Sequence, residues 1–171
     1  LGSALNSVGI IAGLVATNAL VLMLLLAARV PLVDRALGQP AAVALHAKLG
    51  NWVVGGLAVH AAFVLIGGAV FDGADLFSEF GLLWDSTTDF MLAVAGLALL
   101  LVVIVSSIAA ARRRLPYEVW HVIHLLSYAA VGLAIPHMFS MSGLLGEGSW
   151  QRGYWIALLS IAGAALVVFR F

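Results

Sequence analysis

The sequence contains no cysteine, and only 9% of its 171 residues are charged. The absence of cysteine excludes disulfides, thiolate metal sites, iron–sulfur clusters and covalently attached c-type haem. Soluble domains have roughly 25% charged residues. Here 64% of the residues are hydrophobic, more apolar surface than a soluble fold could keep from water. The net charge is zero, which gives no electrostatic support for binding nucleic acid. The composition therefore favours an integral membrane protein.

The long apolar runs predict an all-α membrane protein, a bundle of about five transmembrane helices in a single domain over residues 1–171. The runs place these helices at about 4–29, 40–71, 87–111, 117–141 and 152–171. The first run has neither a basic leader nor a cleavage motif, so we interpret it as a span. The second run is longer than a bilayer requires. We expect it to tilt, protrude or break near Gly67–Gly68.

Charged residues are sorted by sign among the predicted connections. The first connection and its flanks carry Arg29, Arg35 and Lys48, and the third carries Arg112, Arg113 and Arg114. The second connection is purely acidic, with Asp72, Asp75, Glu79, Asp85 and Asp89. Cytoplasmic loops are enriched in Lys and Arg, so the first and third connections are predicted to lie inside. The N-terminus is then outside and the C-terminus, with Arg170, is inside.

Four of the five histidines form a doubled pattern on two predicted helices. His46 and His60 are 14 residues apart, and His124 and His137 are 13 apart, which is roughly 20 Å along a helix. Both helices run from inside to outside in the predicted topology, so their imidazoles would meet at two depths. Imidazole is a common axial ligand of haem iron. The pattern predicts an inner haem iron held by His46 and His124 and an outer one held by His60 and His137, with no residue assigned a catalytic role.

The angular positions fit this pattern unevenly. Fourteen steps of a helix return to within about 40° of the starting face, whereas 13 steps turn by about 220°. Pro136 precedes His137 and removes a helical donor, so we hypothesise a kink or widened turn that re-aims His137. His121 is assigned to a contact behind the ligands or with a haem propionate, an ordinary interfacial histidine being the alternative.

Ordinary packing is the alternative interpretation of each residue taken singly. A membrane histidine often bonds a neighbouring backbone carbonyl, although polar groups within the hydrocarbon are usually functional. Small residues between the histidines would give a macrocycle room or would simply pack helices together; they are Gly50, Gly55, Gly56, Ala58, Ala129, Ala130, Gly132 and Ala134. Large side chains that could line the cofactors are Trp52, Phe63, Tyr128 and Met138. Propionates would meet Arg35, Lys48 or the arginine cluster, which membrane topology alone also explains.

The chain resembles the ferric reductase-like transmembrane domain family, which includes NADPH oxidases and iron-reducing metalloreductases. The resemblance rests on His46–x13–His60 and His124–x12–His137, and on the stretch HLLSYAAVGLAIPH over residues 124–137. The segment RRRLPYEVWH over residues 112–121 is similar to that of bacterial, actinobacterial-type members. Family members commonly have six helices, so the first one would precede Leu1. A bacterial cytoplasmic membrane is the implied location.

The resemblance implies electron transfer through two haem b groups, from a cytoplasmic flavin donor to external ferric iron or oxygen. Many members hold FAD and NAD(P)H on cytoplasmic domains, but this sequence has no dinucleotide fingerprint. A separate flavin reductase domain or protein is therefore the expected partner. The Asp72–Asp89 segment is expected to be an outer loop that caps the outer haem, or simply a solvated loop.

Three alternatives stay open at this point. A stand-alone haem subunit could pass electrons to a periplasmic partner such as a methionine-sulfoxide reductase. A quinol-linked di-haem cytochrome b would keep the same cofactors. A transporter or structural bundle without haem would use the histidines to relay protons or to pack.

Overall fold

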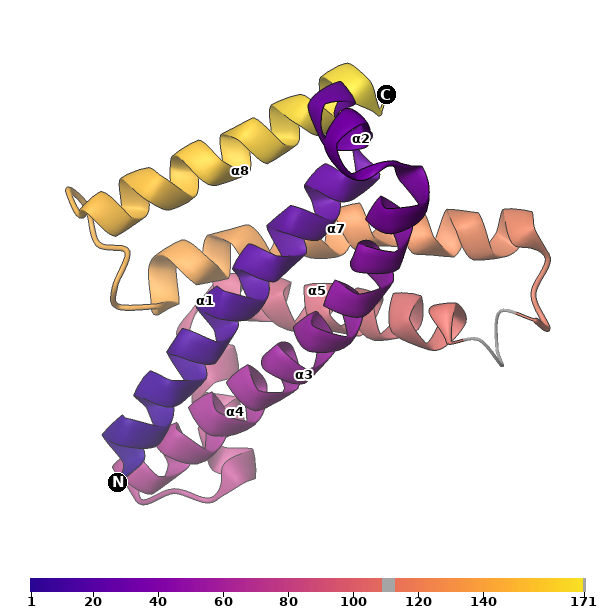
Figure 1. Ribbon diagram of the computed structural model, residues 1–171. Helices are drawn as coiled ribbons and strands as arrows, with labels where there is room; N and C mark the ends of the chain where they lie inside the picture. Colours follow the sequence, from indigo (N-terminus) through magenta and orange to yellow (C-terminus); the bar gives the residue numbers. More distant parts are fainter. Residues whose placement is uncertain (109–112, 171) are drawn as a thin grey trace. The chain divides into compact units, whose positions relative to one another are not determined.

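The computed structural model describes residues 1–108 and 113–170, in which all regular secondary structure is helical and no strand occurs. Its helices, drawn in Figure 1, are α1 (Gly2–Ala27), α2 (Pro31–Leu37), α3 (Gln39–Asp72), α4 (Leu76–Ser86), α5 (Thr88–Ser107), α7 (Tyr117–Met141) and α8 (Trp150–Phe169). Five of them, α1, α3, α5, α7 and α8, are long and apolar enough to cross a membrane. The predicted all-α membrane fold is confirmed, and each span begins and ends within a few residues of its predicted bounds.

The described residues form two compact units. The first comprises Leu1–Phe80 and Gly153–Phe171, and the second comprises Gly81–Arg152. The first therefore holds α1, α2, α3 and α8, and the second holds α5 and α7, with the boundary inside α4. The single domain over residues 1–171 stays a prediction.

In the first unit, α1 and α3 pack side by side and antiparallel (Figure 1). Glycines make this approach close. A Cβ added to Gly2 would lie 2.7 Å from the backbone of Phe71, and one added to Gly56 would lie 2.8 Å from the Cβ of Ala16. Contacts therefore pair the start of α1 with the end of α3, as small residues do between membrane helices. Gly56 thus packs two helices together, the alternative that the sequence left open for it.

In the second unit, α5 packs along α7 in the same way. A Cβ on Gly96 of α5 would lie 2.7 Å from the carbonyl oxygen of Ala130, which is only 3% exposed. Ala130 is therefore part of the α5–α7 interface. Both antiparallel pairs are built on small residues, and each pair carries two of the four candidate histidines.

The acidic connection between α3 and α5 is not the loop expected from the sequence, because the 11-residue helix α4 occupies most of it. Asp75 starts this helix: its Oδ1 accepts hydrogen bonds from the backbone N–H of Phe77 at 2.9 Å and of Ser78 at 3.2 Å. These bonds, together with one from the Ser78 hydroxyl, lower the pKa of the Asp75 carboxyl. The aspartate thus satisfies N–H groups that a helix start leaves unpaired.

Helix α3 is continuous through Gly67–Gly68. Of the three outcomes expected for this long run, a tilt, a protrusion or a break, the break does not occur. Its 34 residues extend about 50 Å, well beyond a hydrocarbon core of about 30 Å. Both glycines serve packing instead: a Cβ on Gly67 would lie 2.6 Å from the backbone N of Asn6, and one on Gly68 would meet the carboxyl group of Glu79. Helix α7 is likewise continuous through Pro136.

The basic residues of the first connection, Arg29, Arg35 and Lys48, are exposed. Arg113 and Arg114 are exposed as well, whereas Arg112 lies outside the described residues. The chain is a multi-pass membrane protein by its five apolar helices.

Candidate histidine site

Two of the candidate ligands, His46 and His60, lie on α3 and point their Nδ1 atoms at backbone carbonyls of α1. His60 Nδ1 is 2.9 Å from the oxygen of Gly9, and His46 Nδ1 is 3.3 Å from the oxygen of Met23. A carbonyl oxygen can only accept a hydrogen bond, so in each pair Nδ1 carries the proton. The lone pair of the neutral imidazole is then on Nε2, the state that an iron ligand needs.

The two carbonyls repeat the spacing of the two histidines. Gly9 and Met23 are 14 residues apart on α1, just as His46 and His60 are on α3. Because the helices are antiparallel, the carbonyl of Gly9, near the start of α1, lies next to His60, the second histidine of α3. A packed histidine without a metal also makes a single bond of this kind. The repetition at equal intervals on both helices is what favours two equivalent sites.

His124 belongs to a small polar cluster on α5 and α7. Its Nδ1 is 3.3 Å from the hydroxyl oxygen of Ser107, which also accepts a hydrogen bond of 3.3 Å from the indole N–H of Trp120. The Trp120 and His124 rings lie 5.1 Å apart. Since a hydroxyl both donates and accepts, Ser107 is compatible with either tautomer of His124.

His137 has a thioether as its Nδ1 partner. The Sδ of Met141, one turn further along α7, lies 3.2 Å from Nδ1 and is 3.7 Å from the donating hydroxyl of Thr87. Sulfur of methionine is a weak acceptor without a proton, so Nδ1 is the donor here as well. The ring of Phe90 on α5 lies 6.4 Å from that of His137. Both candidate ligands on α7, His124 and His137, therefore have neighbours on α5.

The fifth histidine, His121, has different surroundings. Its ring stacks on that of Tyr117, with centroids 5.7 Å apart and planes inclined by 12°. This contact is at the first turns of α7 and uses the ring face rather than a ring nitrogen. The stacking distinguishes His121 from the four other histidines, and its exclusion from the ligand set stays a prediction.

No group of three or more His, Asp or Glu side chains able to hold a metal ion occurs among the described residues. A metal cage made of protein groups alone is therefore not supported there, whereas axial ligation of a haem needs only two imidazoles for each iron. His46 and His60 belong to the first unit, and His124 and His137 to the second. Their pairing as His46 with His124 and His60 with His137 stays a prediction.

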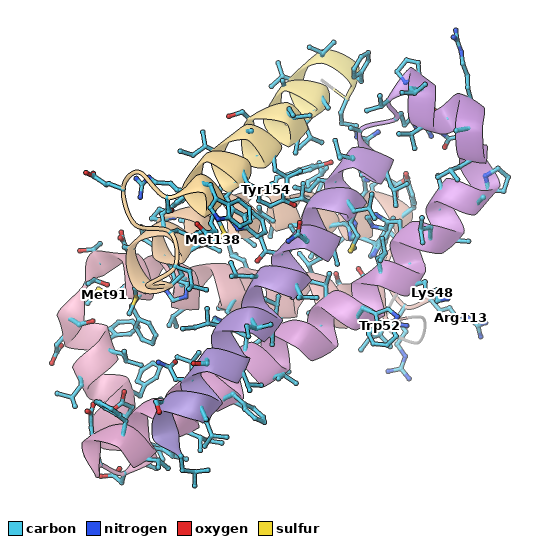
Figure 2. All side chains as sticks on the ribbon, turned by 60° about the vertical axis from the view of Figure 1, so that its left-hand side comes forward. Lys48, Trp52, Met91, Arg113, Met138 and Tyr154 are labelled. Atoms are coloured by element: carbon cyan, nitrogen blue, oxygen red, sulfur yellow. The ribbon has the colours of Figure 1, made fainter. Side chains whose placement is uncertain are left out.

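Two of the predicted accessory residues share one face of α3. Lys48 and Trp52 are one turn apart, and both are labelled on the same stretch of helix in Figure 2. The Trp52 side chain is 70% exposed, which suits an aromatic residue near a membrane–water interface. The roles of Trp52, Phe63, Tyr128 and Met138 as cofactor-lining residues stay predictions.

The sequence did not reveal which groups hold the histidines. Backbone carbonyls of α1 carry no residue signature, and Met141 resembles any other apolar position. Ser107 and Trp120 had a weak signal: Ser107 is one of two serines ending an apolar run, and Trp120 precedes His124 by one helical turn. Such partners become visible only once the packing of α1 on α3 and of α5 on α7 is known.

Comparison with known proteins identifies a protein family whose model matches this chain. The family model described as "Ferric reductase like transmembrane component" matches residues 12–135, well over half of the chain. The match contains His46, His60 and His124 and ends two residues before His137. No curated protein and no solved structure matches the chain. The length and position of the family match, over an all-helical membrane fold, show that the chain belongs to the ferric reductase-like transmembrane family.

Proposed function

We propose that this chain carries electrons across a membrane through two b-type haems, the inner one held by His46 and His124 and the outer one by His60 and His137. Membership of the ferric reductase-like family supports transmembrane electron transfer and an oxidoreductase in general terms. The donor is a cytoplasmic flavin module, with FAD and NAD(P)H held on another domain or protein. The acceptor is external ferric iron or oxygen.

The observation that carries the proposal is the orientation of the histidine rings. The Nδ1 atoms of His46, His60 and His137 each face an atom that only accepts, at 3.3, 2.9 and 3.2 Å. Metal-bound histidines characteristically donate their second ring N–H to such a partner, which orients the ring and raises its basicity. The residues present therefore fit axial ligation through Nε2. A haem bound there would supply a one-electron redox centre.

The chain's own residues also restrict the chemistry. Each iron would be held by two histidines, His46 with His124 and His60 with His137, and the acceptor would then be reduced by electron transfer without binding to the metal. The histidines are half-buried among apolar helices, and the local dielectric constant is one of the factors through which a protein tunes a cofactor's potential. The positive-inside rule predicts that the basic residues of the first and third connections lie on the cytoplasmic side, which is the side of the electron donor in this proposal.

Purified full-length protein tests the proposal. We expect a low-spin haem spectrum that is reducible by dithionite, with two haems per chain. His46→Ala and His124→Ala should each remove the inner haem, and His60→Ala and His137→Ala the outer one. His121→Ala is the matched control, because His121 stacks on Tyr117, and it should retain two haems.

Two results would contradict the assignment. Protein that binds no haem after expression with sufficient haem supply would remove the electron-transfer proposal. Loss of a haem in the His121 variant, with both haems retained in the His124 variant, would move the inner ligand from His124 to His121.

A further inference from the structure

The ring of His60 occupies the space that a side chain at Gly13 would fill. A Cβ built on Gly13 would lie 2.6 Å from Nδ1, 2.9 Å from Cγ and 3.0 Å from Cε1 of His60. Such separations are far below an ordinary van der Waals contact. Gly9, whose carbonyl accepts the Nδ1 hydrogen bond at 2.9 Å, is one helical turn before Gly13. The imidazole therefore lies directly on the backbone of α1, over these two glycines.

We propose that Gly13 is a positioning residue for His60: the missing side chain lets the ring reach the Gly9 carbonyl, and this contact fixes the direction of Nε2. The inference rests on the proposed function in one respect, that Nε2 of His60 binds the outer haem. Gly13 touches the ligand and not the reacting atoms, so it acts through the orientation of the ring.

The backbone of α1 gives no other reason for a glycine at position 13. The residue lies inside a regular α-helix, outside the set of positive-φ glycines, and glycine is unfavourable within a helix. Close packing of α1 on α3 is the competing reason. Gly56 provides the comparison, because a Cβ there would lie 2.8 Å from Ala16 Cβ in the same interface, and the nearest atoms around it belong to Ala16 and Ala12.

The other histidine of α3 lacks an equivalent glycine. His46 reaches the Met23 carbonyl at the longer distance of 3.3 Å, and the residue one turn after Met23 is Ala27. A side chain at Gly13 should therefore disturb the outer site and leave the inner site unchanged. This selectivity separates a positioning role from a general loss of stability.

The test compares Gly13→Ala with Gly56→Ala and wild type in the full chain. One readout is the tautomer of His60, from NMR of isotope-labelled histidine nitrogens in the reduced protein. The second is the pair of haem midpoint potentials and the low-spin electron paramagnetic resonance signals of the oxidised protein. We expect wild-type His60 to be protonated at Nδ1. Gly13→Ala should lose that signal and shift the potential and resonance of one haem only, whereas Gly56→Ala should retain the wild-type values.

Each outcome decides between the two interpretations. Wild-type values in Gly13→Ala, or equal changes in both variants, would overturn the positioning role. If His60 of the wild-type protein is protonated at Nε2, the positioning role is overturned. This measurement needs no variant, so it decides the question even if Gly13→Ala does not fold. If wild-type protein bound no haem, the proposed function would fail, and the tautomer comparison alone would decide the role of Gly13.

Discussion

The four candidate ligands have chemically different Nδ1 partners. His46 and His60 face carbonyl oxygens, His137 faces a thioether and His124 faces a hydroxyl. Only the hydroxyl can also donate, so the tautomer of His124 depends on where the Ser107 proton points. Trp120 already donates its indole N–H to the Ser107 oxygen. The Ser107 oxygen has a second lone pair. It can accept a hydrogen bond from Nδ1–H of His124 when the Ser107 hydroxyl proton points away from that ring.

Ser107→Ala should therefore weaken the inner haem site selectively. Loss of a hydrogen-bond partner behind a metal-bound histidine typically costs about 10- to 100-fold in affinity. The measurement is haem retention during dilution, together with the inner-haem spectrum. Ser106→Ala is the matched control, because its hydroxyl donates to Val103 within the same helix at 2.8 Å. Equal haem loss in both variants, or in neither, would contradict the role assigned to Ser107.

At the scale of helices, α4 has an unusual attachment to α3. Glu79 is only 5% exposed, its carboxyl group packs on Gly68, and its Oε2 atom has no hydrogen-bond partner among the described residues. Burial raises the pKa of the Glu79 carboxyl above its ordinary value of 4.5, and the nearby charge of Asp72 raises it further. The protonated form of Glu79 is thus the one that fits the contact.

Docking of α4 on α3 should weaken as the pH rises. A raised pKa in the folded state means that the stabilising contribution is complete below the ordinary value of 4.5 and is lost as the pH passes through the folded value. Amide hydrogen exchange of residues 76–80, corrected for the intrinsic rate, should increase across this range in wild type. Glu79→Gln cannot ionise, so its protection should be nearly independent of pH. An unchanged pH dependence in Glu79→Gln would assign the effect to another group.

The sequence predicted the spans well because length and hydropathy alone determine them. It missed α4, because a short segment rich in acids between two spans was interpreted as a loop, and the cap at Asp75 was not recognised. It located the candidate histidines but not their partners, since the Gly9 and Met23 carbonyls become neighbours only through the packing of α1 on α3. Of the expected tilt, protrusion or break of the long second run, the break at Gly67–Gly68 does not occur, because both glycines allow a close approach to other elements.

For the whole molecule, the sorted charges predict an orientation in the membrane. The first connection is basic and the segment around α4 is acidic, which predicts that the former lies inside and the latter outside. The lack of native cysteine makes this simple to check, because a single introduced cysteine is the only thiol.

Ala36→Cys in α2 and Asp85→Cys in α4, both at exposed positions, should react differently with a membrane-impermeant maleimide. In intact cells or spheroplasts, the cysteine at position 85 should be labelled within minutes, and the one at position 36 only after permeabilisation. The reverse pattern would invert the topology and exchange the donor and acceptor sides of the proposed electron path.

The antiparallel packing of α1 on α3 bears on the rate of the proposed electron transfer. Both histidines of α3 are held by one neighbouring helix, at carbonyls with the same 14-residue interval, which corresponds to an axial rise of about 21 Å. Tunnelling between two metal centres falls steeply with their separation. If His46 and His60 each hold one haem, as proposed, this single pair of helices would set the spacing of the two centres on the α3 side.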